Sequence, residues 1–391
     1  MTISLRIAQV CPYDLARYGG VRSHIQGLGE ALVARGHQVT VIAPGRSGAL
    51  VETLGSLPVQ QCGTVRPVDF SGTRIDLAWA SREDRRRVLA TGFDVLHLHT
   101  PWNPAIPLQL ALPFRGVRVA TFHDVPGEAT PWWARRLMPL GAAIIRRLLL
   151  HATIGVSPAV SAYLGAGTHA LIPNGIGEPL YDATTATQTT ADPLGDSTVG
   201  PTPGVAPGVA PVVYLGRLEA RKDVGTLLDA MARVTAVLGD RTPPLVIAGD
   251  GPLRGALEAQ AHRLGVTRVT FRGAVRECDK WALLADAQCV VAPSRAGESF
   301  GIVLLEAMRA GSVPIAADNP GYRHVLSDGG ESLLFPAGDA AALADQLIRA
   351  YRDAAWHDAM RSWGATRWPR FAWTRVAEEV ERVYRDALAA A

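Results

Sequence analysis

The hydrophobic positions of the first 175 residues follow two alternating patterns. Short runs rich in β-branched residues predict strands that are buried on both faces. Longer stretches repeat apolar residues at spacings of three and four, as at Val21, Ile25, Leu28 and Leu32, and predict amphipathic helices. Strands that alternate with helices indicate a parallel sheet covered on both sides. The predicted strands are residues 5–11, 37–43, 95–99, 117–123, 152–157 and 171–173.

The same alternation starts again at residue 212. Helical patterns lie between most of the later strands, most clearly over residues 223–238 and 302–310. A last helix is predicted over residues 374–390. The predicted strands of this second region are residues 212–216, 245–249, 269–273, 289–293, 313–316 and 333–335.

Composition changes abruptly between these two regions. Residues 182–211 contain five prolines, four glycines and seven threonines, but no lysine, arginine or aromatic residue. Such a segment buries too little apolar surface to offset its ordering entropy, so we expect a flexible linker or a surface loop. The sequence thus divides into a first domain (1–175), a linker (176–211), a second domain (212–372) and a C-terminal helix (373–391).

Composition also excludes several classes of protein. The chain has 391 residues, 48% of them hydrophobic, and a formal charge of +3, which is too small to indicate a nucleic-acid partner. Its four cysteines form no C-x-x-C pair, which excludes a thiolate zinc cluster and argues against a disulfide framework. Arg6 and Gln9 interrupt the only early apolar run, and no stretch is long enough to span a bilayer. We therefore expect a cytoplasmic protein.

Each of the two predicted domains has a polar group directly after its first strand. Ligands of doubly wound sheets bind at the carboxyl ends of the strands, which is where these groups lie. Gly19 and Gly20 would let backbone amides approach a phosphate at a helix N-terminus, although a plain tight turn is the alternative. Arg217 and Lys222 would clamp a diphosphate by bidentate and point-charge contacts. A solvated basic loop is the alternative there.

The third polar group is the most specific. Glu298 lies in a predicted loop, and Glu306 lies about two turns inside the helix that follows a Ser-Phe-Gly turn. Two carboxylates at this spacing could bracket an elongated polyhydroxy ligand. A capping carboxylate plus a surface glutamate is the alternative, and the unbroken apolar run 302–305 speaks against it. The chain lacks G-x-G-x-x-G, which weakens a dinucleotide-dependent oxidoreductase as an interpretation.

Four motifs together resemble the retaining glycosyltransferase family 4. They are the Glu-x7-Glu element, G-R-L-x-x-x-K from Gly216, Gly-Gly-Val at 19–21, and Ala-Thr-Phe-His at 120–123. Segments 10–24 and 298–304 look most like the bacterial phosphatidylinositol mannosyltransferases of that family. The resemblance implies an α/β fold of the GT-B class: two doubly wound Rossmann-like domains face each other across a cleft, and the C-terminal helix returns to the first domain.

The resemblance implies a hexosyltransferase that acts with retention. The favoured reaction moves mannose from GDP-mannose to a glycolipid, a lipid-linked or a polysaccharide-precursor acceptor. The main alternative is a UDP-sugar-dependent enzyme with a soluble acceptor. A non-catalytic nucleotide-sugar-binding protein is a remote alternative, because Lys222, Glu298 and Glu306 are all present.

The resemblance also implies a role for each site residue. The catalytic residues would be His123, which faces the sugar, Arg217 and Lys222, which stabilise the leaving phosphate, and Glu298, which holds sugar hydroxyls. Glu306 would bind the ribose. No D-x-D occurs, so we expect neither a metal ion nor another cofactor. The implied donor-binding residues are Gly19, Gly20, Arg217, Lys222, Arg272, Gly273, Val275, Glu298, Ser299, Phe300, Gly301, Ile302 and Glu306.

Two stretches bear on the acceptor. Arg85, Arg86 and Arg87 form a basic cluster, and residues 131–148 combine tryptophans, arginines and aliphatic residues. This combination suits a helix that lies on anionic lipid, which would make the protein peripheral on the inner face of the cytoplasmic membrane. The alternative, slightly favoured by the apolar runs 142–145 and 148–150, is a core-facing helix with solvated arginines.

Overall fold

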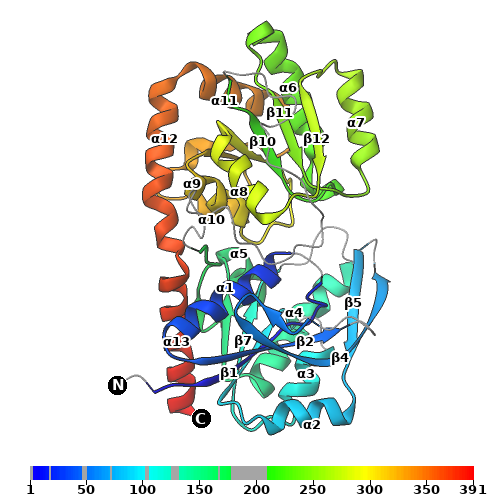
Figure 1. Cartoon of the computed structure of the whole chain (residues 1–391), viewed down its shortest axis with the longest axis vertical. Helices are drawn as coiled ribbons and strands as arrows, with labels where there is room; N and C mark the ends of the chain where they lie inside the picture. The colour runs from blue at the N-terminus through cyan, green and yellow to red at the C-terminus, as the bar shows by residue number, and fades with distance from the viewer. Residues whose placement is uncertain are drawn as a thin grey trace. The chain divides into compact units, whose positions relative to one another are not determined.

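In the computed structural model, the chain folds into two compact units, which are described one at a time (Figure 1). The first unit comprises residues 1–177 and 371–391, and the second comprises residues 178–370. Most of the predicted linker, residues 178–208, lies outside the described residues. The structure describes residues 3–16, 19–45, 51–70, 73–101, 105–124, 132–165, 168–177 and 209–391.

The first unit is built on a mainly parallel sheet. Its strand order is β3-β4-β2-β1-β6-β7-β8-β9, and β5 pairs with β4. The central strands are buried along almost their whole length, as expected for strands covered on both faces. The strands are β1 (Arg6–Val10), β2 (Gln38–Gly45), β3 (Thr53–Leu54), β4 (Leu57–Phe70), β5 (Thr73–Trp79), β6 (Val95–His99), β7 (Val117–Phe122), β8 (Ala152–Gly155) and β9 (Ala170–Leu171).

Helices cover the two faces of this sheet separately. One face packs against α1 (Gly20–Ala34) and α13 (Trp373–Ala390). The other face packs against α2 (Arg82–Ala90), α3 (Ala105–Ala111), α4 (Trp132–Leu149) and α5 (Pro158–Leu164). Helix α13 lies beside α1 (Figure 1), which confirms the prediction that the C-terminal helix returns to the first domain.

Strands β3, β4 and β5 were not predicted from the sequence. β4 runs parallel to β2 in its first part and antiparallel to β5 in its second part. Polar residues such as Gln60, Gln61 and Thr64 interrupt its apolar pattern. This edge of the sheet therefore lacks the continuous apolar run by which the buried parallel strands were recognised.

The second unit has an all-parallel sheet with the order β12-β11-β10-β13-β14-β15. Its central strand β10 places Val213 opposite Val246 and Val290, in a core shared with α8 and α9. All six predicted strands are present. The strands are β10 (Val212–Leu215), β11 (Leu245–Ala248), β12 (Val269–Gly273), β13 (Cys289–Ala292), β14 (Val313–Ala317) and β15 (Leu334–Phe335). The helices are α6 (Val224–Leu238), α7 (Arg254–Arg263), α8 (Glu277–Asp286), α9 (Ile302–Ala310), α10 (Pro320–Val325), α11 (Ala340–Arg352) and α12 (Ala354–Arg367).

Candidate active site

A short turn after β10 holds the first group of cations. Residues Ala220–Lys222 form one 3-10 turn, and Asp223 then adopts left-handed backbone angles (φ 51°) before α6 begins. The carboxylate of Asp223 accepts hydrogen bonds from Thr226 (2.6 Å) and Arg295 (2.5 Å). These contacts stabilise a backbone conformation that is uncommon for a residue other than glycine. The turn fixes the position of Lys222.

Glu298 lies in the loop that joins β13 to α9, as predicted. Its Oε1 accepts hydrogen bonds from Lys222 Nζ at 2.6 Å and from Arg221 Nη1 at 2.9 Å. The side chains of Lys222 and Glu298 are 19% and 11% exposed, so this pair is shielded but within reach of a ligand. The structure thus brings two residues of the proposed catalytic set into direct contact, although they are 76 positions apart.

Gly301 of this loop is required by space. Gly301 has a φ of 100°, and a Cβ atom there would lie 2.5 Å from the ring of Tyr322, which is buried. Gly301 precedes α9, and no side chain in the described part of the chain caps that helix. The first amides of α9 are therefore free of a side-chain acceptor, which favours an anion or a sugar hydroxyl at this end. Ser299, Phe300 and Ile302 flank Gly301, and Phe300 is buried.

Glu306 is the fifth residue of α9, so it lies in the second turn rather than the predicted two turns inside the helix. Its Oε1 accepts a hydrogen bond from Lys280 Nζ at 2.8 Å. Lys280 also pairs with Glu277 at 2.5 Å. The neighbouring carboxylates raise the pKa of Lys280 although burial opposes the charge.

Lys280 is a site residue that the motifs missed. The composition could have identified it, because Lys222 and Lys280 are the two lysines among the 39 basic residues of the chain. Each of them pairs with one glutamate of the Glu-x7-Glu element. Arginine serves at every other basic position, so the two exceptions mark the places where a compact point charge is used.

The remaining donor-site residues of the second unit also follow strand ends. Arg217 lies two residues after β10, and its Nε lies 2.7 Å from Glu219. Glu219 also pairs with Arg221 at 3.3 Å, so it joins Arg217 to the ion pairs of Glu298. Gly273 closes β12 with a φ of 74°, and its carbonyl accepts a hydrogen bond from Gly249 at 2.7 Å. Arg272 precedes it on β12, and Val275 packs partly buried against the core.

In the first unit, Gly19 and Gly20 begin α1. The backbone of Gly19 is extended, and a Cβ atom at Gly19 would meet no described atom within 4 Å. Among the residues that the structure describes, no side chain caps the N-terminus of α1. The first amides of α1 could therefore bind a phosphate, and this contact remains a prediction.

His123, which directly follows β7, belongs to a cluster of four buried histidines. Its Nε2 lies 3.1 Å from Nδ1 of His99 at the end of β6, and the ring of His24 on α1 packs edge-on at 4.5 Å between centroids. His97 stacks on His99 and hydrogen-bonds to Tyr384 of α13 at 2.6 Å. The cluster joins α1, β6, β7 and α13.

Burial controls the protonation of this cluster. Loss of hydration lowers the pKa of His24 to about 4 and that of His97 to about 3, and it lowers the pKa of His99 and His123 well below the usual value. The rings are neutral near pH 7. His123 can therefore accept or donate a hydrogen bond to a sugar without carrying a charge.

Helix α4 has an exposed apolar stripe. Leu137, Leu140, Ile144 and Leu148 follow the spacing of one helix face and are 56–72% exposed, whereas Ala142 packs into the core. Arg147 is also exposed. The favoured prediction of a core-facing helix is thus wrong for Ile144 and Leu148. Among the described residues, no helix is long and apolar enough to cross a membrane.

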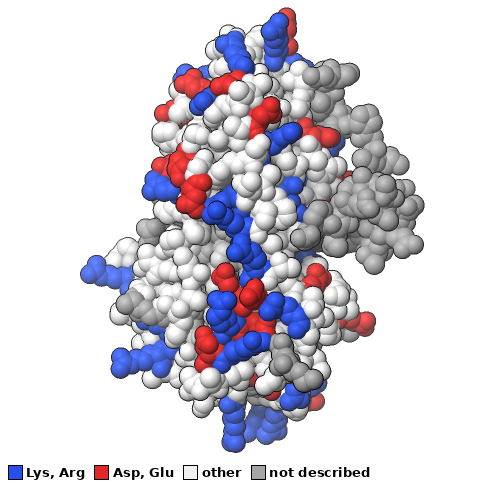
Figure 2. Space-filling model, turned by 90° about the vertical axis from the view of Figure 1, so that its left-hand side faces the viewer, with Lys and Arg blue, Asp and Glu red and all other residues white. Residues whose placement is uncertain are grey.

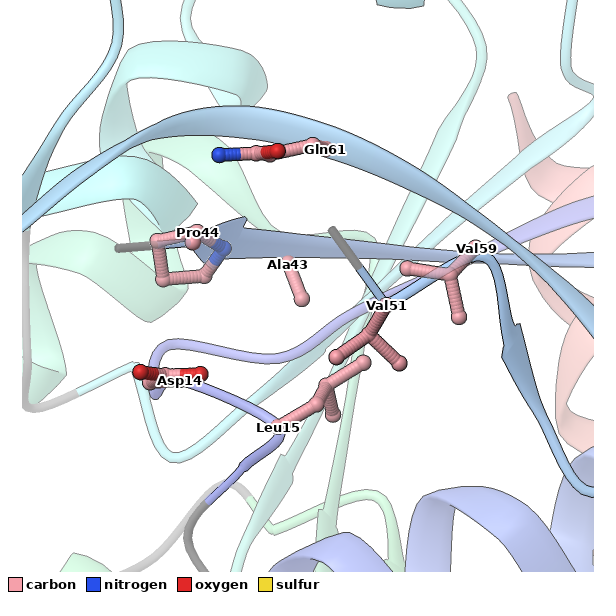
Figure 3. A pocket seen from close by; sticks show the side chains of 8 residues that line it. Asp14, Leu15, Ala43, Pro44, Val51, Val59 and Gln61 are labelled. Carbon is pink, nitrogen blue, oxygen red and sulfur yellow. The ribbon is translucent and has the colours of Figure 1, made fainter. Parts of the chain in front are cut away.

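Two further surfaces carry less information. The cavity shown in Figure 3 lies between β2, β4 and the β1–α1 segment, with Asp14 and Gln61 on opposite sides. Its volume of about 10 Å³ admits roughly one water molecule, so it cannot hold a nucleotide sugar. On the face drawn in Figure 2, acidic and basic side chains are interspersed, in keeping with the small net charge.

Comparisons with known proteins identify the family of the chain. Residues 18–177 match the family model described as Glycosyltransferase Family 4, and residues 206–366 match the model described as Glycosyl transferases group 1. The chain is 34% identical over 97% of its length to a phosphatidyl-myo-inositol mannosyltransferase from Mycobacterium leprae, with 96% of that protein covered. The Mycobacterium tuberculosis protein of the same name is 32% identical over 97% of this chain and 96% of its own.

Solved structures show the same fold at lower identity. A sucrose-phosphate synthase from Thermosynechococcus elongatus superimposes with a TM-score of 0.72 at 24% identity, covering 99% of this chain and all of that one. Anabaena HepE, crystallised with UDP and glucose, superimposes with a TM-score of 0.71 at 20% identity over 98% of this chain and all of HepE. The fold is GT-B, and the chain belongs to glycosyltransferase family 4.

Proposed function

We propose that this glycosyltransferase moves mannose from GDP-mannose to an inositol phospholipid, with retention of configuration and without a metal ion. The observation that carries the donor site is the placement of the two lysines, each paired with one glutamate of the Glu-x7-Glu element. The mannosyl donor and the lipid acceptor are supported by the full-length relatives named phosphatidyl-myo-inositol mannosyltransferase.

Donor binding is an exchange of ion pairs. Arg221 and Lys222 share the single carboxylate of Glu298, and Arg221 also pairs with Glu219. A diphosphate offers both cations a more highly charged partner, and its arrival releases Glu298 to accept hydrogen bonds from sugar hydroxyls. Lys280 holds Glu306 in place for the ribose. Diphosphate and sugar recognition are thereby linked through Glu298.

In the transfer step, the bond from the anomeric carbon to the phosphate oxygen breaks, and a bond to the acceptor oxygen forms on the same face of the sugar. The acceptor proton passes to the leaving phosphate. Lys222 and Arg217 stabilise the charge that develops on that phosphate. His123 is neutral and buried, and it orients the sugar by a hydrogen bond. The products are the glycolipid and the nucleoside diphosphate.

The acceptor side is supported by the exposed stripe of α4. Helices α2, α3 and α4 cover one face of the sheet, and Trp79 at the end of β5 and Leu112 after α3 are also exposed. Between Glu128 and Glu178 the sequence has no acidic residue. An apolar stripe with arginines and without acids suits a surface of anionic lipid, where the acceptor resides.

The scarcity of lysine provides a direct test. An amine-specific acylating reagent can modify few groups besides the N-terminus, Lys222 and Lys280. We expect GDP to protect both lysines against modification, as measured by peptide mass spectrometry, and UDP to protect them less. The N-terminus is the internal control, because its modification should not change. Equal modification of both lysines with and without any nucleotide would contradict the proposed donor site.

A donor screen separates the two candidate nucleotides. We expect GDP release from GDP-mannose in the presence of vesicles with phosphatidylinositol to exceed UDP release from UDP-glucose or UDP-N-acetylglucosamine. The same reaction should proceed in EDTA, because Lys222 and Arg217 take the place of a metal ion. Preferential turnover of a UDP-sugar would favour the alternative enzyme, and loss of activity in EDTA would contradict metal independence.

A further inference from the structure

Three histidines of the first unit present nitrogens to a common point. They are His24 on α1, His99 at the end of β6 and His123 after β7, and all three are buried. One ring nitrogen of each lies within 4.8 Å of those of the other two. The closest pair, His99 Nδ1 and His123 Nε2, is 3.1 Å apart. Tetrahedral zinc with bonds of about 2.0–2.1 Å needs nitrogens about 3.3 Å apart, so small shifts of His24 would complete a site.

Unsatisfied polar atoms surround this point. Both ring nitrogens of His24 and the Oδ1 of Asn174 are buried without a hydrogen-bond partner of ordinary geometry among the described residues. Asn174 lies within hydrogen-bonding reach of His24 and His123 and counteracts the lowering of the pKa of both, but its contacts with them are poorly aligned. Buried polar atoms are nearly always paired, so a group of them around one point indicates a missing ligand. An amide oxygen is a suitable fourth ligand beside three imidazoles.

The donor set selects the kind of ion. Neutral imidazoles bind zinc, copper, nickel and cobalt, whereas magnesium and calcium prefer carboxylate and carbonyl oxygens. The other nitrogen of His99, Nε2, lies 3.2 Å from Oε1 of Gln9, which can accept the remaining N–H when Nδ1 binds the ion.

We propose that His24, His99, His123 and Asn174 bind one divalent transition-metal ion, such as Zn²⁺, and that the bound ion inhibits transfer. The inhibition rests on the proposed function, because the ion would occupy the imidazole of His123 that orients the sugar. The ion is not required for transfer. The residues of the second unit that are proposed to bind the donor include none of these ligands. The protein with a bound ion should therefore still bind nucleotide.

Binding is tested on the full chain after treatment with EDTA and dialysis, with Co²⁺ as a spectroscopic probe. We expect visible absorption bands typical of a four-coordinate nitrogen site, saturating at one Co²⁺ per chain and displaced by Zn²⁺. His24→Phe keeps the aromatic contact with Trp373 (5.2 Å between centroids) but removes both nitrogens. It should weaken Co²⁺ binding at least about a hundredfold. His262→Gln, on α7 of the second unit, is the matched control and should bind as the native protein does.

Inhibition is measured separately. Micromolar Zn²⁺ should slow transfer by the native protein and by His262→Gln at least tenfold, EDTA should restore the rate, and His24→Phe should be resistant relative to its own rate without metal. If no transfer activity is found, the Co²⁺ titration still decides the site. Co²⁺ bands of equal strength in native protein and His24→Phe, or no binding by the native protein, would overturn the proposal. Should His24→Phe fail to fold, Asn174→Leu and His99→Gln replace it in the titration.

Discussion

The two units hold their polar chemistry in opposite ways. In the second unit, Lys222 and Lys280 keep their charges in partly exposed pairs with Glu298 and Glu306 at 2.6 and 2.8 Å. In the first unit, the polar centre is a set of buried imidazoles whose pKa values are lowered by loss of hydration. A charged and accessible site suits an anion that replaces an internal carboxylate. A neutral and dry site suits uncharged hydroxyls, or a metal ion that needs free nitrogen lone pairs.

The largest effect is expected in the charged site. Lys222→Met removes a cation that faces the leaving phosphate, where such contacts contribute about 3–4 kcal/mol in the transition state. We expect kcat to fall at least about a hundredfold. Arg263→Met is the control, since Arg263 is an exposed arginine of α7 in the same unit and its loss should change kcat less than about twofold. Near-native turnover of the Lys222 variant would refute the assigned role.

The next effect concerns the surface of the first unit. Replacing Leu140 and Ile144 with aspartate puts two charges into the exposed stripe of α4. If each side chain is about half buried in lipid, the loss should lower affinity for phosphatidylinositol vesicles about fiftyfold, measured by cosedimentation at low salt. Val237→Asp, at an exposed apolar position of α6 in the second unit, is the matched control. Equal vesicle binding by all three proteins would mean that α4 does not contact the membrane.

A buried charge provides the third comparison. Glu381 of α13 is 2% exposed and accepts hydrogen bonds from Arg35 (2.6 Å) and Arg385, with His37 at 3.3 Å. Burial opposes its charge, but Arg35 and the other cationic neighbours outweigh this and lower its pKa. Glu381→Gln should reduce the free energy of unfolding by about 2 kcal/mol near pH 7. A change within experimental error would show that the ion pairs contribute nothing.

The sign of the pH effect follows from the same shift. Because the pKa of Glu381 is lower in the folded protein than its usual value of 4.5, the stabilisation is present above pH 4.5 and is lost as pH falls below it. The difference in stability between native protein and Glu381→Gln should therefore shrink as the pH falls below about 4.5. Urea unfolding at several pH values measures it, and a difference that grows toward acid would contradict this assignment.

The smallest of these effects tests the second lysine. Lys280→Met leaves Glu306 without its cation at 2.8 Å. We expect the KM for donor to rise about tenfold, equivalent to about 1.4 kcal/mol, with a smaller change in kcat. Lys280→Arg should restore part of the affinity because it keeps the charge. An unchanged KM in Lys280→Met would separate Glu306 from ribose recognition.

The sequence predicted the second unit better than the first, for a physical reason. Parallel strands buried on both faces leave continuous apolar runs, and all six of them were recognised in the second unit. The hairpin of β4 and β5 carries a mixed pattern at one edge of the sheet and was missed. The site residues of the second unit were also easier to predict, because Lys222 and Glu298 each lie in a recognisable local motif.

The histidine cluster shows what local motifs cannot reveal. His24, His99 and Asn174 come from three separate segments, and their proximity depends on the order of strands in the folded sheet. One local signal was present: His97 and His99 alternate along a strand and so share one face. Exposure of Ile144 and Leu148 was equally hidden, because an apolar helix face looks the same in sequence whether it meets the core or lies at the surface.

The most direct test of the account is the product formed on lipid. The full chain is incubated with GDP-mannose and vesicles that contain phosphatidylinositol, with EDTA present, and the glycolipid is extracted and examined by NMR. We expect a mannosyl phosphatidylinositol with the α-anomeric configuration of the donor, and we expect Lys222→Met to form little or none of it. A β-linked product, or transfer only from a UDP-sugar to a water-soluble acceptor, would contradict it.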